Sequence, residues 1–259
     1  MNKNNLKVVI LAGGYGTRLG TLTKLKPKPM VDVCGKPIIE HIIQLYLKSG
    51  FSNFIICGGY KSEVIKDYFK KKFKKNILLN NKNETFIKKN NFTIRIVNTG
   101  KNSLTGGRIK RIRKYVEKDA FFHMTYGDGL SNVNINKLTK FHLKNKKFAT
   151  VTTVKIQVPQ ERFGVVYFKN KNTVKEFVEK PDIKEIFING GFFVLNSKIF
   201  KFIKDDFTMW EAKPLEKIAK QKQLAAFKHT GFWKCMDTIR DRKYLEQFKN
   251  KKFPWNTLN

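Results

Sequence analysis

The chain has 259 residues, of which 41% are hydrophobic and 13% aromatic, so it is long and apolar enough to bury a sizeable core and is not a disordered chain. No run of about 18 apolar residues occurs, which excludes a transmembrane helix, and segment 1–5 lacks the apolar core of a signal peptide, so we expect a cytoplasmic protein. The formal net charge is +33, while the three cysteines and four histidines form no metal-ligand spacing.

Strands and helices alternate along the first half of the sequence. Short apolar runs that end in turn residues predict strands, and apolar residues that recur every three or four positions predict helices. Pro37 fits the first turn of one helix and Gly50 ends it, and Ser62 is expected to cap the next. The predicted strands are residues 7–12, 53–57, 92–97, 121–125 and 149–155, and the predicted helices are residues 37–48, 62–69, 105–116 and 135–144.

The second half is less regular. Segment 70–83, KKKFKKNILLNNKN, is basic and rich in asparagine, and we predict an exposed insertion loop there. Further strands are predicted at residues 164–168, 173–177 and 188–195, and helices at residues 214–220 and 238–249. This alternation predicts an α/β fold with a single Rossmann-like sheet, mixed but mostly parallel, flanked by helices.

A glycine-rich and cationic stretch, LAGGYGTRLGTLTKLKPKPM, follows the first predicted strand at residues 11–30. Ligands of such sheets bind beyond the carboxyl ends of the strands, and glycine lets backbone N–H groups approach a phosphate closely. A dinucleotide fingerprint is excluded because Leu19 stands where glycine is needed, and no Gly-Lys-Ser/Thr triplet completes a P-loop. An ordinary tight turn is the alternative, but Arg18 and the proline-flanked Lys28 favour a phosphate site.

The sequence resembles the sugar-1-phosphate nucleotidylyltransferases along nearly its whole length. The LTGGR segment and the insertion before it are most similar to the branch that transfers cytidylyl groups, and uridylyl or thymidylyl transfer is the nearest alternative. The segments that carry the resemblance are LAGGYGTRL at 11–19, KPKPM at 26–30, LTGGR at 104–108, YGDG at 126–129, RFG at 162–164, EKP at 179–181, INGG at 188–191, GFW at 231–233 and MDT at 236–238.

The resemblance implies an activity and an organisation. The activity is transfer of a cytidylyl group from CTP to α-D-glucose 1-phosphate, giving CDP-glucose and pyrophosphate for the dideoxysugars of O-antigen and other surface polysaccharide. The implied cofactor is magnesium (Mg2+), and the implied assembly is a homo-oligomer. The implied organisation is one nucleotidyltransferase domain, 1–259, with a nucleotide-binding half at about 6–130 and a sugar-binding half at about 131–259.

The resemblance also implies roles for particular residues. The implied catalytic residues are Arg18, Lys28, Asp128 and Asp237, of which the two aspartates would hold the metal. The implied nucleotide contacts are Leu11, Ala12, Gly13, Gly14, Gly16, Thr17, Arg18, Lys28, Ser103, Arg108 and Gly127, and the implied sugar-phosphate contacts are Glu179, Lys180, Asn189, Gly190 and Gly191. The structural alternatives are a turn residue for Asp128, a helix cap for Asp237 and a surface ion pair for Glu179 and Lys180.

The positive charge also admits a function of a different class, nucleic-acid binding. Its best segment is RIKRIRK at 108–114, but the same predicted helix carries an apolar stripe at Ile109, Ile112 and Val116. A helix packed on the core with a basic, solvated face explains this pattern, and lysine is spread along the whole chain. We therefore expect neither nucleic acid nor a membrane as a partner. An inactive relative is a further alternative. The residues that argue against it are the retained Arg18, Lys28, Asp128 and Asp237.

Overall fold

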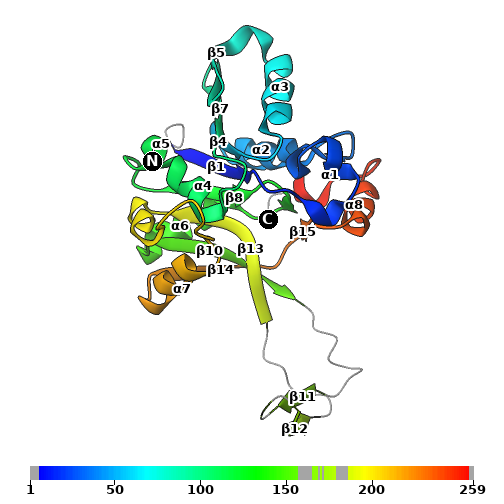
Figure 1. The fold of residues 1–259 in the computed structure, drawn as a ribbon, viewed down its shortest axis with the longest axis vertical. Coiled ribbons are helices and arrows are strands. Elements are labelled where there is room, and N and C mark those ends of the chain that lie inside the picture. Colours follow the sequence, from blue (N-terminus) through cyan, green and yellow to red (C-terminus); the bar gives the residue numbers. More distant parts are fainter. Residues whose placement is uncertain (1–5, 157–164, 169, 171, 179–185, 257–259) are drawn as a thin grey trace.

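The computed structural model describes residues 6–156, 165–168, 170, 172–178 and 186–256 (Figure 1). Its centre is one nine-stranded mixed sheet to which both halves of the sequence contribute. In spatial order the strands are β14 (Leu224–His229), β10 (Ala149–Ile156), β13 (Ile186–Leu195), β8 (Phe122–Tyr126), β1 (Lys7–Ala12), β4 (Asn53–Gly58), β7 (Phe92–Asn98), β6 (Glu84–Lys89) and β5 (Ile77–Asn80).

The central part of this sheet is parallel. Strands β8, β1, β4 and β7 run in the same direction, and β10 pairs in parallel with β14. Strand β13 is antiparallel to both β10 and β8, while β6 is antiparallel to β7 and to β5. The predicted α/β sheet is therefore confirmed, and the carboxyl ends of β1 and β8 meet at one edge, as the sequence leads us to expect.

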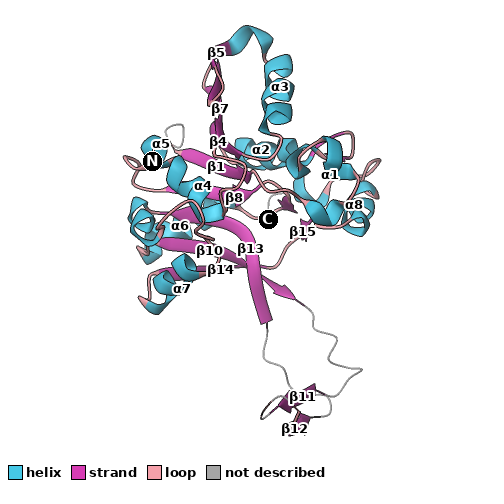
Figure 2. Ribbon diagram, in the orientation of Figure 1, coloured by secondary structure: helices cyan, strands magenta, loops and turns pink. Residues whose placement is uncertain are grey.

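Helices cover both faces of the sheet (Figure 2). The α-helices of the described residues are α1 (Leu22–Leu25), α2 (Ile38–Lys48), α3 (Ser62–Lys72), α4 (Thr105–Arg111), α5 (Arg113–Val116), α6 (Ile135–Asn145), α7 (Lys213–Lys220) and α8 (Ile239–Glu246). The short strand pairs are β2 (Asp32–Val33) with β3 (Lys36–Pro37), β9 (Gly129–Ser131) with β15 (Trp233–Cys235), and β11 (Val165–Phe168) with β12 (Val174–Val178).

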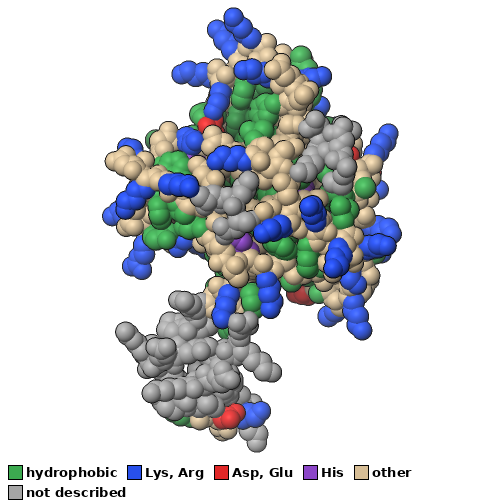
Figure 3. All heavy atoms as spheres, turned by 180° about the vertical axis from the view of Figure 1, so that it is seen from behind, with side chains coloured by type: hydrophobic (Ala, Val, Ile, Leu, Met, Phe, Trp, Pro, Cys, Tyr) green, Lys and Arg blue, Asp and Glu red, His purple; other side chains and the backbone are tan. Residues whose placement is uncertain are grey.

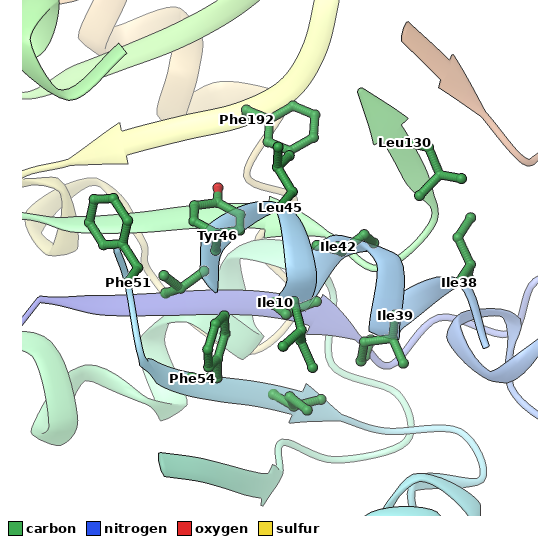
Figure 4. Close-up of a cluster of buried hydrophobic side chains, with 14 of the residues drawn as sticks. Ile10, Ile38, Ile39, Ile42, Leu45, Tyr46, Phe51, Phe54, Leu130 and Phe192 are labelled. Carbon is green, nitrogen blue, oxygen red and sulfur yellow. The ribbon is translucent and has the colours of Figure 1, made fainter. Parts of the chain in front are cut away.

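The sheet separates two hydrophobic cores. Because side chains alternate along a strand, Val8 and Ile10 of β1 belong to one core, while Val9 and Leu11 belong to the other. Figure 4 shows the first core, where the apolar stripe of α2 packs over β1 and β4. These packed layers fix the strand ends from which the candidate site is built.

Three local predictions are wrong. The predicted helix 105–116 divides into α4 and α5 because Ile112, at φ −97° and ψ 5°, leaves the helical conformation. Ser62 is the first residue of α3 rather than its cap, which is Lys61 in a left-handed conformation. Segment 70–83 is not a loop, since it contains the end of α3, a 3-10 turn at Lys74–Asn76 and strand β5. Tertiary pairing with β6 orders this polar segment, which local composition does not reveal.

The surface carries its positive charge diffusely. Figure 3 shows lysine and arginine side chains scattered over the whole visible face, with few acidic ones between them. This distribution agrees with the spread of lysine along the whole sequence. Within the part of the chain that the structure describes, no helix is both long enough and apolar enough to cross a bilayer.

Candidate active site

A cavity of about 400 Å³ opens at the carboxyl ends of β1 and β8. Its volume lies in the range of small-molecule sites. All the predicted nucleotide contacts and all four predicted catalytic residues line it. The lining residues are Leu11, Ala12, Gly13, Gly14, Tyr15, Gly16, Thr17, Arg18, Lys28, Pro29, Lys101, Asn102, Ser103, Leu104, Thr105, Arg108, Tyr126, Gly127, Asp128 and Asp237.

The loop after β1 presents its backbone to this cavity. Within the described structure, the N–H groups of residues 14–18 donate to no protein acceptor, whereas the following Leu19 and Gly20 close a 3-10 turn by donating to Gly16 and Thr17. Successive N–H groups that face a cavity form a binding site for an anion. The loop therefore has the donors that the phosphates of a nucleotide require.

The floor of the cavity is a cluster of four charged side chains, which we call the carboxylate cluster: Arg18, Lys28, Asp128 and Asp237. The Lys28 ammonium donates to Asp128 Oδ2 at 2.6 Å and to Asp237 Oδ1 at 2.7 Å, and the Arg18 guanidinium lies 3.1 Å from Asp237 Oδ1. The two aspartates are 109 positions apart in the sequence, and the fold brings them to one lysine.

The proton affinities in the carboxylate cluster follow from these contacts. Burial by itself lowers the pKa of Lys28, but the Asp128 and Asp237 carboxylates outweigh it, and the pKa is raised above its ordinary value. Burial likewise raises the pKa of Asp237, but Lys28 and Arg18 lower it more, so that its pKa falls below the ordinary value. Lys28 and Asp237 are therefore both charged at neutral pH.

The same floor has the donor groups for a divalent cation. One oxygen of Asp128, one oxygen of Asp237 and the sulfur of Cys235 all lie within 4.8 Å of one another. Carboxylate oxygens are ligands that magnesium accepts, usually together with waters and phosphate oxygens, whereas a thiol is not. The two aspartates thus fit magnesium, and in this structure Lys28 and Arg18 together balance their charge.

Arg108, on α4, meets a different kind of partner. Its side chain is 4% exposed, and no carboxylate of the described residues pairs with it. Its guanidinium instead donates to a group of neutral oxygens, which we call the carbonyl shell. The shell consists of the carbonyl oxygens of Gly13 at 2.8 Å, Gly58 at 3.3 Å, Gly100 at 2.8 Å and Lys101 at 3.4 Å, and the hydroxyl of Thr99 at 2.9 Å.

Glycine at position 13 is required by this arrangement. A Cβ atom there would lie 2.1 Å from Arg108 Nη1, which is far inside van der Waals contact. Arg108 therefore binds three loops together, after β1, β4 and β7, rather than pointing every N–H at a ligand. Burial lowers its pKa, but an arginine keeps its charge.

The predicted sugar-phosphate contacts are only partly described. Glu179 and Lys180 lie outside the described residues. Asn189 and Gly190 are on β13, next to the cavity rather than in its lining, and Asn189 Nδ2 lies 3.5 Å from the hydroxyl of Tyr126. Trp233 Nε1 donates to the Gly190 carbonyl at 2.7 Å, which fixes this part of β13.

Comparison with known proteins agrees with this geometry. The family model described as nucleotidyl transferase matches residues 7–244, which is most of the chain. The chain belongs to the nucleotidyl transferase family. It is 44% identical to glucose-1-phosphate cytidylyltransferase of Salmonella typhimurium (strain LT2) over 264 aligned positions, covering 97% of this chain and 99% of that protein. It is 39% identical to a probable glucose-1-phosphate cytidylyltransferase of Bacillus subtilis, covering 95% and 97%.

Solved structures of similar proteins support the same fold. The crystal structure of HddC from Yersinia pseudotuberculosis complexed with GMP-PN has a TM-score of 0.66 and 25% identity, covering 93% of this chain and 98% of that one. A UDP-glucose pyrophosphorylase complexed with UDP-glucose has a TM-score of 0.67 at 18% identity, covering 93% and 97%, which shows the fold alone.

Sequence reasoning missed part of this nucleotidyl transferase site. Tyr15, Asn102, Thr105 and Tyr126 line the cavity but were not predicted to do so. Tyr15 and Tyr126 stand inside quoted motifs, and their place beside glycines was the available signal. Asn102 precedes the predicted Ser103, and nothing in its own residue type distinguishes it from the many other asparagines of the chain.

Proposed function

We propose that this nucleotidyl transferase moves the cytidylyl group of CTP onto glucose 1-phosphate, giving CDP-glucose and pyrophosphate. The observation that carries the proposal is the 44% identity, over nearly the full length of both chains, to a glucose-1-phosphate cytidylyltransferase. The geometry supports it, because one cavity joins unpaired backbone N–H groups, two cationic side chains and two carboxylates.

The reaction is a single displacement at phosphorus. A phosphate oxygen of glucose 1-phosphate attacks the α-phosphorus of CTP and forms a new P–O bond, while the bond from that phosphorus to the pyrophosphate oxygen breaks. No covalent intermediate with the protein is needed, so positioning and charge stabilisation supply the rate. In this proposal the N–H groups of residues 14–18 hold the phosphates, and Lys28 and Arg18 balance the charge that develops on them.

We propose magnesium as the cofactor, held by Asp128 and Asp237. A bound magnesium ion supplies charge neutralisation and alignment of the phosphate oxygens. The chain's own contribution is to hold the two carboxylates close together, as their shared contacts with Lys28 do here. When phosphates enter the cavity, the Lys28 ammonium has both the charge and the position to contact them.

The remaining predictions about the site and its setting stay proposals. Asn189, Gly190 and Gly191, with Glu179 and Lys180, are proposed to hold the sugar phosphate, and Ser103 and Arg108 to frame the nucleotide. We propose a single domain over 1–259, a homo-oligomeric assembly and a role in surface-polysaccharide dideoxysugar synthesis. A cytoplasmic location is supported by the three cysteines, Cys34, Cys57 and Cys235, which are all free.

Pyrophosphate release with a panel of nucleotides tests the proposal. The protein, with magnesium and glucose 1-phosphate, is assayed with CTP, UTP, dTTP and GTP. Cytosine offers an exocyclic amine and an N3 acceptor where uracil and thymine offer O4 and N3–H, so a site built for one leaves buried groups unpaired with the other. We expect CTP to exceed the others by at least about a hundredfold in kcat/KM, as loss of one or two buried hydrogen bonds implies.

The outcomes of this panel separate two levels of the proposal. Equal use of CTP and UTP would contradict the cytidylyl assignment but not the nucleotidyl transferase family. Turnover with mannose 1-phosphate in place of glucose 1-phosphate would contradict the sugar. Failure with every triphosphate and both sugars would contradict the activity altogether.

A further inference from the structure

A carboxylate outside the carboxylate cluster touches two sides of the nucleotide cavity. Glu211 follows the fully buried Trp210 in the chain and precedes α7, and it is partly buried itself. Its Oε1 accepts a hydrogen bond from the Tyr126 hydroxyl at 2.5 Å, and its Oε2 accepts one from the Thr105 hydroxyl at 2.6 Å. Tyr126 and Thr105 both line the cavity, whereas Glu211 itself stands behind them.

The two hydroxyl groups come from different walls. Tyr126 ends β8, two residues before Asp128, so it belongs to the floor that carries the carboxylate cluster. Thr105 begins α4, the helix that carries Arg108. One carboxylate therefore links the floor to the wall that contains the LTGGR segment. No described lysine or arginine forms an ion pair with Glu211, so the two hydroxyl donors are the contacts that account for it.

The chain around Glu211 supports the LTGGR segment from behind. The Leu104 N–H donates to the Asp206 carbonyl at 2.8 Å, and the Gly107 N–H donates to the Thr208 carbonyl at 3.2 Å. The Trp210 N–H donates to the Thr105 hydroxyl at 2.9 Å. Segment 206–211 and the start of α4 are thus joined by four hydrogen bonds, of which Glu211 accepts the last.

The paired glycines of the motif are explained by this support rather than by the ligand. A Cβ atom at Gly107 would lie 2.2 Å from the Asp206 carbonyl oxygen, and one at Gly106 would lie 2.6 Å from the Thr208 carbonyl oxygen. Only glycine allows the two backbones to approach so closely. The position of this wall is therefore set by segment 206–211, and Glu211 is the point at which that segment also reaches the floor.

We propose that Glu211 is a positioning residue that fixes the separation of the floor and the LTGGR wall, and so sets the fit of the cavity to the nucleotide base. The nucleotide named in the test rests on the proposed function. The Tyr126 hydroxyl donates its hydrogen to Glu211, and its oxygen can still accept one from Asn189 Nδ2. The contact with Asn189, on the proposed sugar side, is the longer of the two, so Glu211 is the main partner of Tyr126. Loss of the carboxylate releases Tyr126 and Thr105 from their common acceptor, and the base loses its fixed frame.

Three single substitutions test this, each of which keeps the size of the side chain. Glu211→Gln leaves one acceptor oxygen in place of two, Tyr126→Phe removes the donor from the floor, and Thr105→Val removes the donor from the wall. Glu216→Gln, at an exposed position of α7, is the matched control. The measurements are KM for CTP and for glucose 1-phosphate, the ratio of kcat/KM for CTP to that for UTP, and the melting temperature.

For Glu211→Gln we expect KM for CTP to rise about tenfold, the scale of one lost hydrogen bond to a charged group. The preference for CTP over UTP should fall by a similar factor, while KM for glucose 1-phosphate changes less than about threefold. A double variant that combines Glu211→Gln with Tyr126→Phe or with Thr105→Val should raise KM for CTP by less than the product of its two single effects. The reason is that each pair of residues forms one hydrogen bond, which either substitution alone already weakens.

Two results would overturn the inference. One is an unchanged KM for CTP and an unchanged nucleotide preference in Glu211→Gln, whatever happens to the melting temperature. The other is an equal loss of kcat with every nucleotide and an unchanged KM, which a merely structural role would produce. If wild-type protein prefers another nucleotide, the proposed function fails, and the same comparison is then made with that nucleotide by titration calorimetry.

Discussion

The carboxylate cluster and the carbonyl shell each hold a cationic side chain beside the cavity, but they do so with different partners. Lys28 is paired with two carboxylates at 2.6 and 2.7 Å, whereas Arg108 is surrounded by neutral oxygens. In the first region two cations, Lys28 and Arg18, balance two carboxylates, and Asp237 contacts both of them. In the second region the positive charge is not cancelled, and five acceptors from three loops depend on it.

We infer from this difference that the ion pairs of the carboxylate cluster can be replaced during the reaction, whereas the hydrogen bonds of the carbonyl shell are permanent. The groups of an ion pair at the surface of a cavity can change partners when phosphates and a metal enter. The cation then contacts a phosphate and the carboxylates contact the metal, so each charge again has a partner of opposite sign. A buried guanidinium that donates to carbonyl groups cannot leave without stranding them. We therefore expect substitutions in the carboxylate cluster to reduce turnover with little effect on stability, and substitutions in the carbonyl shell to reduce stability as well.

The largest effect is expected for the two aspartates. Asp128→Asn and Asp237→Asn each remove one negative charge from the proposed magnesium site without changing side-chain size. We expect kcat to fall by about three orders of magnitude, the upper end of the range for loss of one preorganised electrostatic contact. Steady-state pyrophosphate release with saturating CTP and glucose 1-phosphate measures this fall.

The control for the aspartates is stability. The melting temperatures of both variants should stay within about 3 °C of wild type, because each carboxylate is partly exposed and its ion pair is solvent-screened. Removing divalent cations with EDTA should abolish wild-type turnover, and magnesium should restore it. Near-wild-type turnover of both variants, or turnover without a divalent cation, would contradict the role given to the carboxylate cluster.

A smaller loss is expected for the cations of the same cluster. Lys28→Ala should lose about 2–4 kcal/mol of transition-state stabilisation, or roughly 30- to 1000-fold in kcat/KM. Arg18→Ala should lose less, near the lower end, because the Arg18 side chain is 73% exposed while that of Lys28 is only 12% exposed. If Arg18→Ala is the more damaging of the two, the ranking by burial is wrong.

The fold was largely predictable from local pattern, and its exceptions depend on tertiary contacts. Apolar runs predicted β1, β4, β7, β8 and β10 with bounds close to those observed. Strand β14 was missed because its sequence, LAAFKH, has no clear alternation, and it is ordered by its parallel pairing with β10. The break at Ile112 likewise has no signal in a sequence whose apolar spacing fits one continuous helix.

Many of the residues that line the cavity were predicted from the sequence, but their contacts were not. Resemblance supplied Arg18, Lys28, Asp128 and Asp237, and the structure places them around one floor. The resemblance could not supply the carbonyl shell, because every residue has a backbone carbonyl group and residue type does not indicate which ones meet Arg108. It could not supply Glu211 either, because the partners of Glu211 lie 85 and 106 positions away in the sequence. Distant pairings of this kind follow only from the packed fold.

Arg108 tests the second half of the comparison. Arg108→Met removes a buried charge, which by itself stabilises, but it leaves several buried carbonyl groups without donors, and that loss is the larger. We expect a melting temperature roughly 5–10 °C lower, from about 2–3 kcal/mol in a domain of this size. Thermal denaturation followed by circular dichroism measures the shift, and CTP binding should weaken with it.

Gly13→Ala is the complementary change from the loop side. The added Cβ would displace the Arg108 guanidinium, so this variant should resemble Arg108→Met in both stability and CTP binding. Gly14→Ala is the matched control for stability alone, because a Cβ at Gly14 meets no atom within 4 Å. If Arg108→Met keeps wild-type stability and loses only activity, the carbonyl shell is not a permanent contact and the contrast with the carboxylate cluster fails.

The smallest effect is expected for an exposed hydrogen bond that also holds the loop after β1, the one between Tyr15 and Asn102. The Tyr15 hydroxyl donates to Asn102 Oδ1 at 2.9 Å, which joins the loop after β1 to the segment before α4 on the exposed side of the cavity. Tyr15 is 42% exposed, so water can replace this bond, and its ring keeps its contact with Tyr60 in a Tyr15→Phe variant. If Arg108 already fixes the loop from below, Tyr15→Phe should raise KM for CTP by less than about threefold and leave the melting temperature unchanged, as expected for an exposed neutral hydrogen bond. Asn102→Ala should behave alike, because it removes the other half of the same bond. A tenfold rise in KM for CTP in both variants, with Arg108→Met less affected, would show that the outer bond rather than the carbonyl shell holds the loop in place.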